Sequence, residues 1–221
     1  MGQYLEDSLR HVKFKHPFTC LIAGMTGSGK TYLLRDILKY FKDIILIDTP
    51  LLEVVWAYGI WQPLYEEVIP NVKITYIKGL PKEEDLIGAH IIVIDDLMQE
   101  ASKEVVDLFT KKSHHNNQSV FFITQNFFHK DLRTVSLNSH YLILFKNPRD
   151  ESQLLSLGRQ LSARNPLAFL KVFQEATTGK HSYLVVDCRQ DTPTELRYRT
   201  NIIPVDGIFS PTVLIPKTRH V

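Results

Sequence analysis

One short segment of the sequence combines the residue types that hold a phosphate group: GMTGSGKT, at residues 24–31. Gly24, Gly29, Lys30 and Thr31 satisfy the pattern G-x-x-x-x-G-K-[ST]. Glycines let the backbone curl so that its N–H groups face a phosphate, and a helix that begins here adds the partial positive charge of its N-terminus. Lys30 is then expected to reach the β- and γ-phosphates of ATP, and the Thr31 hydroxyl to bind Mg²⁺. The expected nucleotide-binding residues are Gly24, Met25, Thr26, Gly27, Ser28, Gly29, Lys30 and Thr31.

Two acidic residues end an apolar run further along the chain, HIIVIDD at residues 90–96. The run predicts a buried strand with Asp95 at its C-terminal tip, where a carboxylate can hold Mg²⁺ through water. Thr31 and Asp95 are therefore the expected Mg²⁺ ligands. Asp96 can accept a proton from an attacking water or orient that water, although many hydrolytic motors have the longer Glu here. The alternative is that Asp96 only caps the helix or turn that follows.

A third polar position follows the apolar run SVFFIT, where Gln125 and Asn126 end a further predicted strand. Hydrolytic phosphate-loop enzymes keep a γ-phosphate sensor at such a strand end, and Gln125 is the first candidate, with Asn126 second. An arginine, often from a neighbouring subunit, stabilises the charge that develops at the γ-phosphate. Arg149 and Arg133 are the better candidates for this arginine finger, ahead of Arg159. Each arginine also fits a solvated surface residue, and Gln125 also fits an ordinary strand end.

The elements that must position these residues follow from the apolar patterns. Continuous apolar runs predict buried strands at residues 18–24, 43–48, 90–96, 119–126 and 141–145. Alternation predicts a half-exposed strand at 72–77, and a final strand pair is expected at 182–187 and 195–200. Helices are predicted from the phosphate loop through Phe41 and at 102–112, 150–161 and 166–177. The segment 49–71 is mixed, with Pro50, Pro63 and Pro70 as breakers.

Strands separated by helices predict an α/β fold, with a mainly parallel sheet flanked by helices and a small C-terminal strand pair. The phosphate loop, the metal-site strand and the sensor strand follow one another in the order expected of a P-loop NTPase of the ASCE, or RecA-like, type. We expect a basic N-terminal segment at residues 1–17, the P-loop ATPase domain at 18–201 and an irregular C-terminal tail at 202–221.

Composition and charge limit the classes of function. The formal net charge of +2 is too small to indicate nucleic-acid binding by itself, so DNA contact requires local basic clusters or several subunits around a ring. No stretch reaches the roughly 18 apolar residues that span a bilayer, and the N-terminus lacks the apolar core of a signal peptide. Cys20 and Cys188 lie inside apolar runs and are expected to be buried thiols. We expect a soluble intracellular protein without membrane contact.

The motifs together resemble a known family. The segments that carry the resemblance are GMTGSGKT, IIVIDDLM, ITQNFFH, SLNSHYLILFKNPRD and LVVDCRQDTPTELRYRTNI. They are similar to the genome-packaging ATPases of large DNA viruses and of the virus-like Polinton (Maverick) elements, the poxvirus-type members of the FtsK–HerA superfamily of P-loop motors. The resemblance covers roughly residues 15–205, and its sensor-strand region is more specific than the phosphate motif.

The resemblance implies a five-stranded core in which the sensor strand lies between the phosphate-loop strand and the metal-site strand. It implies a ring of five or six subunits around double-stranded DNA, with ATP hydrolysis coupled to pushing DNA into a preformed capsid. Capsid vertex proteins are then expected partners, in the host nucleus or in a cytoplasmic virus factory. Carried over by motif, Lys30 and Thr31 bind ATP–Mg²⁺, Asp95 binds the metal, Asp96 takes the catalytic-acid position and Gln125 is the sensor.

Three further features have competing interpretations. The segment KKSHHNNQS, residues 111–119, could face DNA phosphates or form a solvated helix end. Arg197 and Arg199 are expected to share one face of the last strand pair, where they could contact DNA or a neighbouring subunit, or simply be exposed. Four aromatic residues between the second and third predicted strands are expected to form core or subunit contacts rather than base-stacking platforms; they are Trp56, Tyr58, Trp61 and Tyr65.

Two other classes of function remain alternatives. A P-loop kinase of a small metabolite would need an arginine-rich lid, and it would not need the acid at Asp96. A nucleotide-gated switch or scaffold would bind ATP and order an oligomer with little turnover. DNA-stimulated hydrolysis separates a motor from both alternatives.

Overall fold

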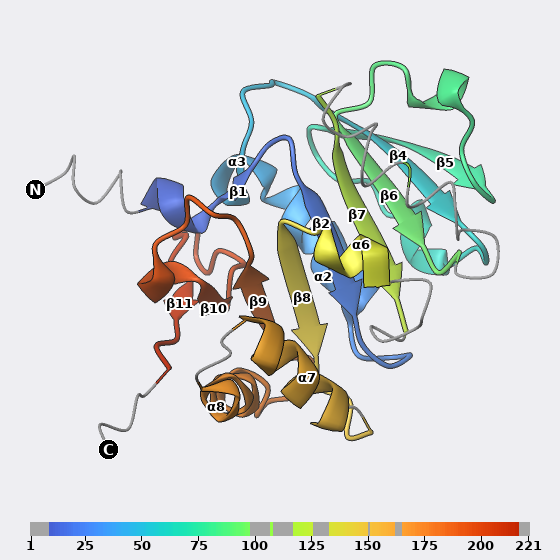
Figure 1. The fold of residues 1–221 in the computed structure, drawn as a ribbon. Helices are drawn as coiled ribbons and strands as arrows, with labels where there is room; N and C mark the ends of the chain where they lie inside the picture. The colour runs from blue at the N-terminus through green and yellow to red at the C-terminus, as the bar shows by residue number, and fades with distance from the viewer. Residues whose placement is uncertain are drawn as a thin grey trace, which may run out of the picture.

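The chain is described from a computed structural model, which covers residues 9–97, 107, 117–125, 133–149, 151–161 and 165–216. Its main feature is one large twisted sheet with helices on both faces (Figure 1). The strands of this sheet are β2 (Thr19–Ala23), β4 (Leu52–Tyr58), β5 (Val72–Lys78), β6 (Ile91–Asp95), β7 (Ser119–Thr124), β8 (Tyr141–Phe145), β9 (Tyr183–Asp187), β10 (Tyr198–Thr200) and β11 (Thr212–Val213). The predicted α/β fold with a mostly parallel sheet is confirmed.

The order of the strands across the sheet is β11-β10-β9-β8-β2-β7-β6-β4-β5. The strands from β8 to β5 are parallel to their neighbours. Strand β7 pairs with β2 on one side and with β6 on the other, so the sensor strand lies between the phosphate-loop strand and the metal-site strand, as the resemblance implies. The parallel part has one strand more than the expected five, because β5 pairs with β4 at the edge.

The second predicted strand was placed wrongly. In the apolar run 43–48, Asp43 and Ile44 belong to α3 (Phe41–Ile44), and only β3 (Ile45–Leu46) is extended. Strand β3 pairs with β1 (Phe14–Lys15) in a separate two-stranded sheet. The central sheet instead contains β4, which comes from the segment 49–71, where prolines were expected to interrupt regular structure. Its sequence LEVVWAY is rich in β-branched and aromatic residues and mostly buried, as a strand inside a parallel sheet requires.

Helices cover the two faces of the sheet with separate hydrophobic cores. Helix α2 (Lys30–Lys39) packs Leu34 against Ile22 and Phe121 on one face. Helices α6 (Arg133–Leu137), α7 (Glu151–Leu161) and α8 (Pro166–Ala176) pack with Leu21 and Phe122 on the other face (Figure 1). Successive strand residues point to opposite faces, which is why neighbours in the sequence belong to different cores. The predicted helices at 150–161 and 166–177 are confirmed, whereas the one at 102–112 lies outside the described residues apart from Asp107.

The expected C-terminal strand pair is confirmed as β9 and β10, and it extends the same sheet. Strand β9 is antiparallel to β8, β10 to β9, and β11 to β10. The last predicted strand is shorter than expected because its first residues form the 3₁₀ turn η5 (Thr194–Leu196). The segment 202–221 is not irregular throughout, since it supplies β11. The proposed division into segments at residues 17 and 201 stays a prediction.

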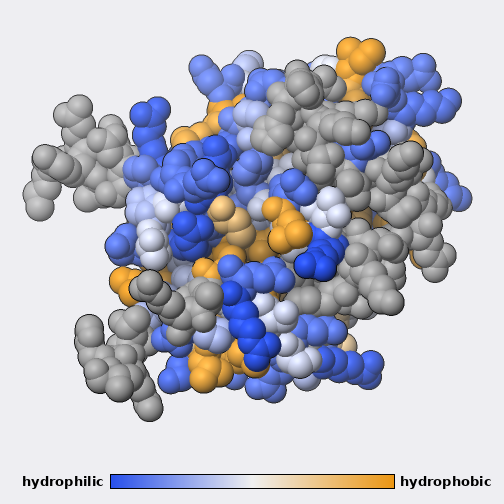
Figure 2. Space-filling model, in the orientation of Figure 1, coloured by the Kyte–Doolittle hydropathy of each residue, from blue (hydrophilic) through white to orange (hydrophobic). Residues whose placement is uncertain are grey.

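The face of the molecule drawn in Figure 2 is mostly polar where it is described. Figure 2 shows hydrophilic side chains over most of the described surface of one face, with hydrophobic side chains in small separate groups. Cys20 is buried and Cys188 partly buried, and both are free thiols. Among the described helices, none has the length and apolar character that would let it cross a bilayer.

Candidate functional site

The phosphate loop connects β2 to α2 at the C-terminal edge of the parallel strands. Gly27 and Gly29 have φ angles of 77° and 102°, in the left-handed region that glycine adopts most easily. Gly24 has a different requirement, because a Cβ there would come within 2.6 Å of the Cβ of Phe145 on the adjacent strand β8. Each of these glycines therefore has a structural reason within the loop. The loop then continues directly into α2 at Lys30.

Lys30 lies inside the loop and is bound by neutral groups. Its ammonium group donates hydrogen bonds to the carbonyl oxygens of Gly24 and Met25, at 2.7 and 2.9 Å. The residue is only 9% exposed. Burial lowers the pKa of Lys30, and the nearby carboxylates of Asp96 and Asp95 only partly oppose this shift. A phosphate group in the loop would supply the negative charge that favours the protonated form.

Asp95, the last residue of β6, is 3% exposed. Its Oδ2 accepts a hydrogen bond of 2.7 Å from the hydroxyl group of Tyr65. Burial raises the pKa of Asp95, and the hydrogen bond from Tyr65 acts in the opposite direction. Burial and the Asp95 carboxylate also raise the pKa of Tyr65, so the phenol stays protonated and donates. The carboxylate of Asp95 and the hydroxyl of Thr31 are oxygen ligands of the kind that Mg²⁺ prefers, so this donor set fits the metal.

Tyr65 is held in place by an aromatic cluster. Its ring stacks on Tyr76 with 5.0 Å between ring centroids, and it also contacts Trp56 and Trp61 at 5.4 and 5.3 Å. The hydroxyl of Tyr76 accepts a hydrogen bond from Arg35 of α2. The prediction that these aromatic residues form core contacts is confirmed for Trp56 and Tyr65, which are buried. The hydrogen bond to Asp95 could not be predicted, since no local sequence signal distinguishes Tyr65 from the other aromatic residues in this segment.

Asp96 and Gln125 form a direct contact at the same edge of the sheet. The Nε2 of Gln125 donates to Oδ2 of Asp96 at 2.7 Å. Asp96 has a φ of 55°, in the left-handed region that Asp tolerates better than most residues. Its backbone N–H bonds to the carbonyl of Ile123 at 3.3 Å, which turns the residue toward the end of β7. The alternative that Asp96 caps a following helix concerns residues after Leu97, which lie outside the described part of the chain. Asn126, the second sensor candidate, also lies outside it.

The phosphate loop and the acidic residues face each other across one cavity of about 260 Å³. The residues that line this cavity are Thr26, Gly27, Gly29, Lys30, Thr31, Tyr32, Gln62, Asp95, Asp96, Ile123 and Gln125. Tyr32 and Gln62 were not predicted as part of the site. The cavity therefore brings together residues expected to bind phosphate, to bind the metal and to orient water, from four segments of the sequence. Three residues of the predicted nucleotide-binding set do not line it: Gly24, Met25 and Ser28.

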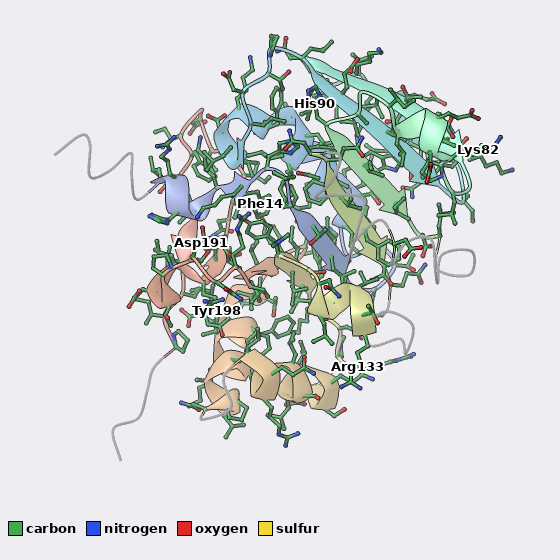
Figure 3. All side chains as sticks on the ribbon, turned by 45° about the horizontal axis from the view of Figure 1, so that its top comes forward. Phe14, Lys82, His90, Arg133, Asp191 and Tyr198 are labelled. Carbon is green, nitrogen blue, oxygen red and sulfur yellow. The ribbon has the colours of Figure 1, made fainter. Side chains whose placement is uncertain are left out.

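The candidate finger arginines lie outside this cavity. Arg149 follows β8, and its backbone N–H bonds to Oδ1 of Asn147 at 3.1 Å. It is exposed at the same edge of the sheet as the phosphate loop, because β8 is the parallel neighbour of β2. Arg133, labelled in Figure 3, is the first residue of α6 and is also exposed. Arg159 on α7 is exposed as well. No described contact joins any of the three to the cavity of its own chain.

The predicted exposed face at Arg197 and Arg199 is wrong. Arg199 forms an ion pair of 2.8 Å with Asp187, and the two side chains are 0% and 1% exposed. Arg197 is bound to the backbone carbonyls of Asp187 and Thr192. The alternation argument failed because Arg197 ends the turn η5 instead of belonging to β10. The other basic candidate, residues 111–119, lies outside the described residues up to position 116.

Comparison with known proteins agrees with this geometry. The family model described as "Poxvirus A32 protein" matches residues 3–193. No curated protein gives a significant match. The genome packaging NTPase B204 from Sulfolobus turreted icosahedral virus 2, in complex with ATP-gammaS, is 14% identical with a TM-score of 0.50, and the match covers 83% of this chain and 96% of that chain. Its complex with AMP is 17% identical with a TM-score of 0.47, covering 77% and 92%.

A more distant match is the ATPase DotB from Legionella pneumophila, which is 13% identical with a TM-score of 0.38. That match covers 62% of this chain and 43% of DotB. At such identities structural likeness concerns the fold alone, and the match to the ATP-gammaS complex of B204 supports the P-loop NTPase fold.

Proposed function

The chain belongs to the poxvirus A32 protein family, and from this membership we propose that it hydrolyses ATP to move double-stranded DNA into a preformed viral or virus-like capsid. The observation that carries the proposal is the cavity in which the phosphate loop faces Asp95 and the Asp96–Gln125 pair. A nucleotide-binding protein without turnover needs the loop, but it has no need for a paired acid and amide opposite it. The pair is the arrangement expected of a hydrolytic site.

In the proposed mechanism each residue acts through the groups that it presents to the cavity. Lys30 exchanges its two carbonyl acceptors for phosphate oxygens. The negative charge of these oxygens compensates the buried positive charge of Lys30, which the neutral carbonyls do not. Thr31 and Asp95 would hold Mg²⁺, which when bound neutralises charge on the β- and γ-phosphates. Asp96 orients the attacking water and accepts its proton. Gln125 donates to one oxygen of Asp96, so that the other oxygen can face the water. The same side-chain amide of Gln125 also senses the γ-phosphate.

The wider assembly is also part of the proposal. A ring of five or six subunits around DNA would bring an arginine of one subunit to the cavity of the next. Arg149 is the first candidate because it is exposed at the edge of the sheet where the phosphate loop lies, and Arg133 is the second. The ring would contact double-stranded DNA without sequence preference and dock on capsid vertex proteins, in the host nucleus or in a cytoplasmic virus factory.

The test is ATP hydrolysis by the purified chain with and without double-stranded DNA. We expect DNA to raise turnover severalfold. Lys30→Ala should lose ATP binding and therefore turnover. Asp96→Asn should keep ATP binding but lose turnover by a factor of about 10² to 10⁴, because it removes the proton acceptor. Asp206→Asn is the matched control, since Asp206 is an exposed acid, also with a positive φ, in a turn outside the site.

Two results would contradict the proposal. Tight ATP binding without turnover at every protein concentration, and without any response to DNA, would indicate a nucleotide-gated switch. Transfer of the γ-phosphoryl group to a small metabolite in place of water would indicate a kinase.

A further inference from the structure

The loop between α8 and β9 contacts the phosphate loop. His181 belongs to this loop, and its Nδ1 lies 3.0 Å from the carbonyl oxygen of Ser28. The ring also packs closely against Gly29, since a Cβ on that glycine would come within 3.3 Å of the same nitrogen. Because a carbonyl oxygen can only accept, this hydrogen bond requires that Nδ1 carries the proton. The contact joins two segments 153 residues apart in the sequence.

The hydrogen bond acts on one particular peptide unit. The carbonyl of Ser28 and the N–H of Gly29 belong to the same unit, and in a trans peptide these two groups point in opposite directions. Gly29 lines the cavity, whereas His181 does not. Holding the Ser28 carbonyl against His181 therefore directs the Gly29 N–H toward the cavity, where phosphate oxygens would accept its hydrogen bond.

This peptide unit needs such a restraint because of the glycine beside it. Gly29 has a φ of 102°, and glycine populates positive and negative φ with similar ease, so the unit can rotate at little cost. An unrestrained unit could turn its carbonyl toward the cavity and repel a phosphate. The loop's own hydrogen bond from Ser28 N–H to the Met25 carbonyl restrains the preceding peptide unit, not this one.

His181 itself adopts an unusual backbone conformation. Its φ is 60°, in the left-handed region that non-glycine residues rarely occupy because it is sterically strained. The loop is held in this shape by a hydrogen bond of 2.6 Å from the Ser182 hydroxyl to the Gly179 carbonyl. Such strain is retained where the surrounding structure requires it and often accompanies function. Here it aims the imidazole at the phosphate loop.

We propose that His181 is a positioning residue for nucleotide binding, which holds the Ser28–Gly29 peptide in the orientation that accepts a phosphate. It acts through the peptide unit and does not contact the nucleotide. The inference rests on the proposed function, because it concerns how the phosphates of ATP are bound. It assigns to the C-terminal antiparallel part of the sheet a role in the phosphate site.

The test compares His181→Gly with His181→Asn. Both residues accept a φ of 60°, so neither adds backbone strain, but only Asn keeps a donor. The amide nitrogen of Asn is bonded to Cγ, as Nδ1 is in His, and therefore takes nearly the same place. We expect His181→Gly to weaken binding of Mg²⁺–ATP about three- to tenfold, the worth of one hydrogen bond, and His181→Asn to stay within about twofold of the wild type.

Inorganic tripolyphosphate is the second probe, because it has the phosphates without the base or sugar. His181→Gly should weaken its binding by the same factor as that of ATP. The melting temperature of each ligand-free variant, measured alongside, should not separate His181→Gly from His181→Asn. Thr178→Ala is the matched control: it removes an exposed side-chain hydrogen bond, to the Glu175 carbonyl, from the same loop without affecting the imidazole, and it should bind both ligands as the wild type does.

Three outcomes would overturn the inference: His181→Gly binding as tightly as the wild type, His181→Asn binding as weakly as His181→Gly, or Thr178→Ala losing as much affinity as His181→Gly. Failure of the folded wild-type chain to bind ATP would overturn the proposed function and this inference together. Normal ATP binding by the wild type and by every variant would overturn this inference alone.

Discussion

The described part of the chain buries charged side chains at several places, and two of these places compensate the charge in different ways. Between β9 and β10, the guanidinium group of Arg199 lies 2.8 Å from the carboxylate of Asp187, with both side chains almost fully buried. At the nucleotide cavity, Lys30 is bound by two carbonyl oxygens and Asp95 by the hydroxyl of Tyr65. Neither of these two residues forms an ion pair with another residue in the described part of the chain. One cluster is balanced by opposite charge and the other by neutral groups.

The difference indicates what each cluster is for. A buried charge is costly unless an opposite charge compensates it. Arg199 and Asp187 compensate each other, which ties the last strands to the sheet. Burial lowers the pKa of Lys30 and raises the pKa of Asp95, so both would be less costly if neutral. ATP with Mg²⁺ would bring the missing charges, negative for Lys30 and positive for Asp95. At the nucleotide cavity, neutral partners therefore leave the buried charges of Lys30 and Asp95 available to a charged ligand.

The largest expected effect is at the balanced cluster. Asp187→Asn leaves the guanidinium group of Arg199 buried without its counter-charge, and we expect the free energy of unfolding to fall by about 3–5 kcal/mol. Urea unfolding measures this loss. The control is Asp191→Asn, which removes the exposed partner of Lys15 (Figure 3, Asp191 labelled) and should cost less than about 1 kcal/mol. Equal small losses for both variants would show that the buried pair is not the stabilising feature.

The same substitution at the nucleotide cavity should have the opposite sign. Asp95→Asn removes a buried charge while keeping an oxygen that accepts from Tyr65. We expect the ligand-free protein to gain about 1–2 kcal/mol in free energy of unfolding, a common consequence of removing a functional charge. The variant should also lose the tightening of ATP binding by Mg²⁺, measured as Kd with and without the metal. A loss of several kcal/mol would mean that Asp95 has a compensating charge, and the contrast between the two clusters would fail.

A smaller effect is expected at the neutral partner. Tyr65→Phe removes the hydroxyl that donates to Asp95 and should cost about 1 kcal/mol in free energy of unfolding. A double-mutant cycle with Asp95→Asn separates this bond from the packing of the ring. The loss should be smaller in the Asp95→Asn background, where the acceptor has no charge. The same loss in both backgrounds would show that packing, and not the hydrogen bond, is what the substitution disturbs.

The smallest predicted effect is a pH dependence. The pKa of folded Asp95 is raised above its ordinary value of 3.8, so the folded state binds the proton more tightly than the unfolded state. Above the folded pKa, the charged form of Asp95 lowers the stability of the protein. This loss of stability disappears as the pH falls from the folded pKa toward the ordinary value. The stability difference between the wild type and Asp95→Asn should close on acidification, because both proteins share every other acid. Urea unfolding over a series of pH values measures this, and a widening gap would mean that a cation holds the pKa of Asp95 down.

The sequence predicted most of the sheet because its central strands are buried on both faces. Such strands read as continuous apolar runs, which located β2, β6, β7 and β8. The same argument failed between DIILID and LEVVWAY, which are both mostly apolar. Neither run carries a local signal that decides which of them pairs with β6. The structure gives that place to β4 and leaves only Ile45–Leu46 extended in the other run.

The candidate site divides in a similar way. Gly24, Lys30 and Thr31 belong to one continuous motif, because a phosphate cradle is made from consecutive backbone N–H groups. Asp95 and Gln125 were each predicted to lie at the end of a buried strand, and the two strand ends meet at one cavity because the strands are parallel. The hydrogen bond from Tyr65 to Asp95 joins residues 30 positions apart, and the one from His181 to Ser28 joins residues 153 positions apart. No local sequence pattern predicts either bond.

The sequence by itself therefore determined the phosphate loop, the acidic strand end, the fold class and the resemblance to packaging ATPases, since each depends on neighbouring residues or on a local period of burial. Only the tertiary structure decided which buried charges are paired. Arg199 became a structural residue because β9 brings Asp187 beside it, and Asp95 kept a neutral partner because the segment before β5 brings Tyr65. The partner of a buried charge depends on which strands and loops become neighbours in space, and that is a property of the folded chain.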